Sequence, residues 1–83
     1  MELTELEKER REQILAAIAA ELPPITYKNW ERWKAVLGMA PGTVANDDSL
    51  GRGPKEYVYM GRVKGYPRAA LIEYLRNKMR FTA

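Results

Sequence analysis

Apolar positions recur along this chain with a helical period over most of its length. The first predicted helix runs from Thr4 to Leu22, because Thr4-Glu5-Leu6-Glu7 has the form of a capping box and Pro23-Pro24 cannot continue a helix. Its first half is almost entirely charged, whereas its second half carries one apolar face of Ile14, Leu15, Ile18 and Leu22. We therefore expect a helix that docks through its C-terminal half.

The next segment is rich in aromatic residues and predicts a second helix. Thr26 suits its N-cap, Leu37 its last residue and Gly38 the left-handed position that follows. A stripe repeats along it at three- and four-residue steps, made of Tyr27, Trp30, Trp33 and Leu37. In so small a protein we interpret this stripe as hydrophobic core rather than as a ligand site.

A short helix and a strand are predicted in the middle of the chain. Pro41 suits the first position of a helix that carries Val44 inward and stops at Gly51. Residues 56–60 then alternate as a strand does, with Val58 and Met60 on one face. The opposite face of that strand carries Tyr57 and Tyr59.

The last third of the chain predicts a turn and a closing helix. Residues 61–65, Gly-Arg-Val-Lys-Gly, form the expected turn, and Pro67 begins the helix. The buried stripe of this helix is expected to be Leu71, Ile72, Leu75 and Met79.

The composition narrows the possible functions. Eighty-three residues, 46% of them hydrophobic, make one small domain. The chain has no Cys and no His, which removes the usual thiol, acid–base and zinc chemistry and fits a reducing, cytoplasmic location. Ser49 is the only serine and has no His to activate it, so we expect no enzyme and no cofactor. No apolar run is long enough for a membrane span.

Charge is distributed very unevenly along the chain. Residues 50–83 hold eight cations and two anions, a net charge of +6, whereas residues 1–22 have a net charge of −3. A cluster of one sign attracts a partner of the other sign, and the phosphate backbone of a nucleic acid is the commonest such partner of a basic surface. An acidic protein surface is the alternative.

The order of elements and one phrase of sequence resemble a known family. The phrase is Gly51-Arg52-Gly53-Pro54, then residues 57–62 (YVYMGR), then residues 66–75 (YPRAALIEYL). It looks like the winged helix-turn-helix DNA-binding domain of phage excisionases and MerR-like regulators. The resemblance covers the second half of the chain well and residues 26–50 more loosely. It implies a mainly α domain with a small two-stranded β wing over residues 25–83. The N-terminal amphipathic helix and Pro-Pro link over residues 1–24 lie outside the resemblance and precede this domain.

The same resemblance implies how this chain would bind double-stranded DNA. The short helix from Pro41 would lie in the major groove, and Thr43 and Asn46 would reach base edges or phosphates. The wing would lie against the backbone or the minor groove. Phosphate contacts are expected from the wing and its flanks, namely from Arg52, Lys55, Tyr59, Arg62, Lys64 and Arg68.

Two adjacent carboxylates depart from the family pattern, because Asp47 and Asp48 occupy the expected recognition helix. They could point away from DNA and pair with Arg52 or Lys55, they could accept from cytosine amino groups, or the helix no longer binds DNA. We favour the first interpretation. As a metal site the run Asn46-Asp47-Asp48-Ser49 lacks the spacing of a calcium loop, and no metal is expected.

The leading hypothesis is a DNA-binding protein of phage or mobile-element type, acting as an excisionase-like directionality factor or a transcriptional regulator. Its further partner would be a recombinase or another phage protein. A small terminase subunit's DNA-recognition domain is a variant of the same class. The alternative is a protein-interaction module on the same fold. Self-association through the N-terminal helix is a weaker option, because a Leu3/Leu6 heptad would place Arg10 and Gln13 at its next core positions.

Overall fold

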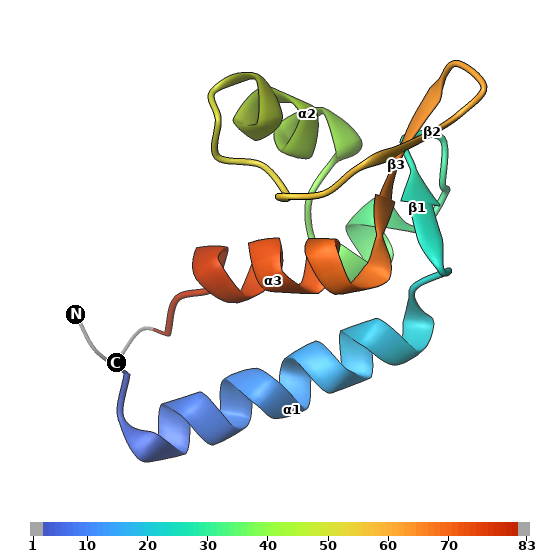
Figure 1. Cartoon of the computed structure of the whole chain (residues 1–83). Helices are drawn as coiled ribbons and strands as arrows, with labels where there is room; N and C mark the ends of the chain where they lie inside the picture. Colours follow the sequence, from blue (N-terminus) through green and yellow to red (C-terminus); the bar gives the residue numbers. More distant parts are fainter. Residues whose placement is uncertain (1–2, 82–83) are drawn as a thin grey trace.

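The computed structural model describes residues 3–81, which form four helices and a three-stranded antiparallel sheet. In chain order the elements are α1 (Glu5–Glu21), β1 (Ile25–Tyr27), η1 (Trp33–Leu37), α2 (Pro41–Ser49), β2 (Val58–Met60), β3 (Val63–Pro67) and α3 (Arg68–Lys78). Figure 1 shows α3 in the middle of the molecule, with α1 along one side of it and α2 and the β2–β3 hairpin on the other. None of the helices in residues 3–81 has the length and apolar character needed to cross a membrane.

Helix α1 begins and ends where local rules predict. The Thr4 hydroxyl accepts from the Glu7 amide at 3.1 Å, and the Thr4 amide donates to the Glu7 carboxylate at 3.0 Å, which completes the capping box. Leu15 is buried, but Ile14 is 42% exposed, so its predicted burial is wrong. With Leu15 at the centre of the buried stripe, Ile14 points about 100° away from it because successive helical residues are separated by that rotation.

The predicted helix over residues 26–37 is wrong in its first half. Residues 25–27 form β1, which pairs with β3 in the register Ile25↔Pro67, Thr26↔Tyr66 and Tyr27↔Gly65. Thr26 is therefore a fully buried strand residue and no N-cap, and its hydroxyl has no hydrogen-bond partner. The pairing of β1 with a strand about forty residues later has overridden the local helical pattern.

Only the second half of that segment is helical, as the single wide turn η1. Trp33 is buried, as predicted for the core, and its indole N–H donates to the Tyr27 carbonyl at 3.0 Å. Gly38 ends η1 in the left-handed conformation with a φ of 70°, which confirms its predicted role.

Helix α2 follows the prediction closely. It starts with Pro41 at its first position, and Val44 is completely buried. The helix ends at Ser49, and Gly51 turns the chain with a φ of 76°. Gly53 then passes so close to α2 that a β-carbon there would lie 2.7 Å from the Asp48 Cα, and this contact explains why a glycine occupies the position.

The hairpin is tighter than the sequence suggested. Met60 pairs with Val63, so the turn consists of Gly61 and Arg62 alone, and the predicted turn over residues 61–65 is wrong. Its last three residues belong to β3, which also pairs with β1 and gives the sheet order β1-β3-β2. The sheet therefore has three strands where a two-stranded wing was expected.

One hydrophobic core joins all parts of the fold. From α3 it contains Leu71 and Leu75, as predicted, together with Tyr74, while Ile72 and Met79 pack at its edge. The other buried members come from four elements and the residue that ends α1: Leu15, Leu22, Trp33, Val44 and Tyr66. Helix α1 is thus docked on the remainder of the domain through its C-terminal half, as expected.

Candidate nucleic-acid interface

The outer face of α2 carries the two polar residues expected to reach DNA. Thr43 and Asn46 are both exposed and lie three residues apart, so they share one face of the helix. Figure 1 shows α2 and the β2–β3 hairpin as the two projections on the side of α3 away from α1. Both side chains are accessible to solvent, on a helix that lies on that side.

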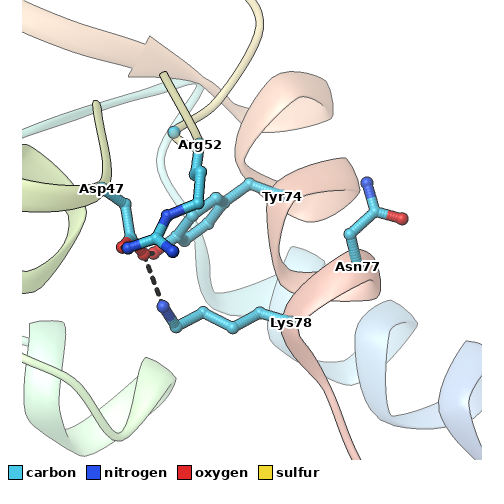
Figure 2. Close-up of a pocket in the computed structure, with 6 residues that line it drawn as sticks. Asp47, Arg52, Tyr74, Asn77 and Lys78 are labelled. Atoms are coloured by element: carbon cyan, nitrogen blue, oxygen red, sulfur yellow. Dashed lines mark hydrogen bonds and ion pairs between the residues drawn. The ribbon is translucent and has the colours of Figure 1, made fainter. Parts of the chain in front are cut away.

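The neighbouring carboxylate of Asp47 points into the molecule. It is 8% exposed and accepts a hydrogen bond of 2.5 Å from the Tyr74 hydroxyl. Figure 2 shows Lys78 from α3 and Arg52 from the loop after α2 reaching the same carboxylate, with Lys78 bonded to it and Arg52 more distant at 3.9 Å. The hydrogen bonds from Lys78 and Tyr74 hold the pKa of Asp47 below its usual value.

The second carboxylate, Asp48, is bound to the sheet instead. Lys64 of β3 donates to it in a close ion pair, and the Tyr66 hydroxyl donates at 3.3 Å. The Lys64 ammonium also lies 4.0 Å from the centre of the Tyr57 ring. The hydrogen bond to Asp48 raises the pKa of Lys64, so the lysine stays charged at neutral pH.

These contacts bear directly on the three interpretations of the acidic pair. Both carboxylates turn away from the outer face of α2 and are neutralised by cations, as the first interpretation expects. Of the two partners it named, Arg52 contacts Asp47 while no ion pair joins Lys55 to either carboxylate in the described residues. The closest partners, Lys78 and Lys64, were not foreseen.

Both tyrosines that donate to the carboxylates are themselves buried. Burial raises the pKa of Tyr74 and that of Tyr66, and in each case the neighbouring aspartate adds to the rise. The hydroxyls therefore stay protonated and act as donors. The acidic pair functions as an anchor that joins α2 to α3 through Asp47 and to β3 through Asp48.

The structure separates the expected phosphate-binding residues into two groups. Arg52, Lys55, Tyr59 and Arg62 are exposed, and neither Lys55 nor Arg62 forms an ion pair within residues 3–81. Lys64, in contrast, is bound to Asp48 and lies within β3 rather than at the turn.

Arg68 also has an internal contact. Its guanidinium donates to the Leu22 carbonyl at 2.8 Å and so occupies the C-terminal end of α1. On the same side of the molecule, Arg76 of α3 makes hydrogen bonds of 3.0 and 2.7 Å to Glu12 of α1. Part of the excess positive charge of the second half thus holds the fold together, whereas Lys55, before β2, and Arg62, at the hairpin turn, form no ion pair within residues 3–81.

Sequence reasoning missed Lys28 as a candidate contact. This exposed residue follows β1 and lines a groove between α2 and the sheet, whose other lining residues are Trp33, Pro41, Ala45, Asp48, Ser49, Tyr57, Lys64 and Tyr66. It was missed because residues 26–37 were predicted to form a helix, whereas residues 25–27 form β1 and Lys28 follows that strand. The run Ile-Thr-Tyr directly after two prolines was the available signal for a strand that would end beside Lys28.

Among residues 3–81 no group of three or more His, Cys, Asp or Glu side chains is placed to hold a metal ion. Comparisons of the chain with protein-family models, with curated proteins and with solved structures gave no match.

Proposed function

We propose that this chain is a small, sequence-specific DNA-binding protein with a winged helix-turn-helix architecture, resembling phage excisionases and MerR-like regulators. Helix α2 would enter the major groove, and the β2–β3 hairpin would act as the wing. In this proposal the protein carries out no chemistry and needs no cofactor. It would work in the cytoplasm as a directionality factor or a transcriptional regulator beside a recombinase or another phage protein.

The observation that carries the proposal is the division of charge around α2. Its two carboxylates are turned inward and neutralised, while Thr43 and Asn46 stay on the open face. The hairpin on the same side exposes Arg62, and no carboxylate occurs in residues 57–67. A helix with polar outer residues beside a hairpin with a free cation suits base edges and phosphates respectively.

DNA binding can be tested directly by titrating a fluorescent duplex at several salt concentrations. We expect log Kd to vary linearly with log salt, because each neutralised phosphate releases counterions. Lys55→Ala with Arg62→Ala should lower the slope by about two, near one for each lost phosphate contact. Arg10→Ala is the control, since Arg10 is also an exposed cation but lies on α1.

A chain that is folded but does not bind the duplex at low salt would overturn the proposal. The same result would favour the second candidate, a protein-interaction module, because the fold would then present its basic face to an acidic protein. If Arg10→Ala lowers the salt slope as much as each of the Lys55 and Arg62 substitutions does, DNA does not bind specifically on the side of α2 and the hairpin.

A further inference from the structure

The outward face of the sheet is apolar at every position. The strand register places Ile25, Tyr27, Val58, Met60, Val63, Gly65 and Pro67 on one face, opposite the buried face of Thr26 and Tyr66. An antiparallel sheet with one solvated face ordinarily alternates apolar with polar residues. This arrangement needs an explanation, because the sequence has exposed apolar side chains where polar ones would cost nothing.

At the end of the sheet away from the hairpin turn, the side chains of this face cover one another. At Gly65 an added β-carbon would lie 2.5 Å from Ile25 Cγ2 and 2.7 Å from Tyr27 Cε1, so both β1 side chains lie across the middle strand there. Ile25, Tyr27, Val58 and Pro67 are accordingly only partly exposed.

The tip of the hairpin is different, because Met60 is 62% exposed and Val63 46% exposed. They face each other across the hairpin and form what we call the tip pair. The tip pair lies beside one unpaired cation and a very short turn. Gly61 and Arg62 alone connect β2 to β3, and Gly61 takes a φ of 65°, the left-handed conformation that a tight hairpin requires. Arg62 is exposed and has no ion pair within the described residues. Two exposed apolar side chains beside an unpaired cation complement a partner site with an apolar interior and negative charge at its edge.

From this geometry we infer that the tip pair is a wedge that enters the minor groove of DNA and partly unstacks one base step. The inference rests on the proposed function and specifies how the hairpin would take part in it. The groove is about 6 Å wide, so that side chains at a hairpin tip enter it more readily than the strands do. Apolar side chains such as Met are inserted between base steps by several minor-groove proteins, with a nearby Arg or Lys reading the groove. Arg62 would bind the phosphates or the groove edge while Met60 and Val63 contact the bases.

The test uses the full chain and a relaxed plasmid incubated with a topoisomerase. Unstacking a base step locally unwinds the duplex, and the enzyme converts that unwinding into a changed linking number that persists after the protein is removed. We expect wild-type protein to shift the topoisomer distribution in proportion to its occupancy. The variant Met60→Gln with Val63→Thr should bind the plasmid within about twofold of wild type, with an unchanged salt slope, because no phosphate contact is removed. At equal occupancy its shift should fall to less than half.

Leu6→Gln is the matched control, since Leu6 is 58% exposed and lies on α1, away from the hairpin and α2. It should leave both affinity and linking number unchanged. A wild-type protein that binds the plasmid without a shift would overturn the wedge and leave the proposed DNA binding intact, whereas a folded wild-type protein that fails to bind would overturn both. An undiminished shift in the tip-pair variant would also overturn the wedge. A second copy of the chain is the other possible partner of the tip. If wild type is a dimer that causes no shift and the tip-pair variant is a monomer, the tip contacts a second copy and the wedge is overturned.

Discussion

The two sides of α3 are held to it by different interactions. On the side of α1, Leu15 and the C-cap residue Leu22 join Leu71 and Leu75 of α3 in the hydrophobic core. On the other side, α2 supplies Val44 as its only buried apolar side chain and adds the carboxylate of Asp47. The Arg76–Glu12 ion pair that joins α1 to α3 is partly solvent-exposed and adds little. The first side is therefore held mainly by burial of apolar surface, which does not depend on pH. The second side depends on ion pairs and hydrogen bonds that do. The helix proposed to contact DNA is therefore the one whose position responds most to solution conditions.

The largest effect is expected from the apolar core. Leu71→Ala should lower the free energy of unfolding by about 3 kcal/mol and Trp33→Ala by about 3–5 kcal/mol, through lost burial and a residual cavity. A domain of this size has little more stability than that, so Trp33→Ala should be largely unfolded by circular dichroism. Urea denaturation measures the effect of Leu71→Ala.

Leu50→Ala provides the matched control for Leu71→Ala, because Leu50 is 58% exposed. It should change stability by less than about 0.5 kcal/mol. Equal losses for the two leucine variants would show that the assigned core is wrong.

The second prediction concerns Asp47 and distinguishes the two sides by pH. Its pKa is lowered in the folded protein by the hydrogen bonds from Lys78 and Tyr74. The stabilisation is therefore complete above the unfolded value of about 3.9 and is lost as the pH falls through the lower folded value. Asp47→Asn should be less stable than wild type at neutral pH, and the difference should shrink as the solution is acidified below about pH 4.

Urea titrations of wild type, Asp47→Asn and Leu71→Ala at neutral and acidic pH provide this measurement. The deficit of Leu71→Ala should remain similar at both pH values, because no charge is removed. A deficit of Asp47→Asn that is the same at both would mean that Asp47 does not anchor α2 through its charge.

The third prediction contrasts two cations of the hairpin. Arg62→Ala should reduce the salt slope of DNA binding by about one unit. Lys64→Ala should weaken binding more than Arg62→Ala does, because it leaves Asp48 as an unpaired negative charge beside α2. Adding Asp48→Asn to Lys64→Ala should restore part of that affinity, and fluorescence titrations of a labelled duplex give all three values. If Asp48→Asn restores nothing, the ion pair has no influence on the side proposed to face DNA.

The smallest effect is expected at Thr26, a buried polar residue of β1. Its side chain is fully buried and its hydroxyl has no partner. Thr26→Val removes that unpaired hydroxyl and keeps a β-branched strand residue, so it should raise stability by about 1 kcal/mol. Thermal melting would show a higher midpoint, whereas a lowered midpoint would mean that the hydroxyl is satisfied in solution.

Several features of the fold were predictable because their causes lie within one helical turn. The capping box at Thr4, the proline stop after α1, Pro41 at the start of α2 and Gly38 after η1 all follow from the residues next to them. Periodicity also identified Val44, Leu71 and Leu75 as buried. It failed at Ile14, because the apolar face of α1 is broader than the stripe that α3 covers.

The sequence by itself determined the start and end of α1, the start of α2 and which half of the chain is basic, because these features depend on neighbouring residues or on composition. Only the tertiary structure decided that residues 25–27 are a strand, because that strand exists through its pairing with β3. It also decided the roles of the charges, since Asp47 meets Lys78 across 31 positions and Asp48 meets Lys64 across 16. A charge shows in the sequence as a type of residue, but whether it is free or neutralised depends on the distance to its partner, and the fold sets that distance.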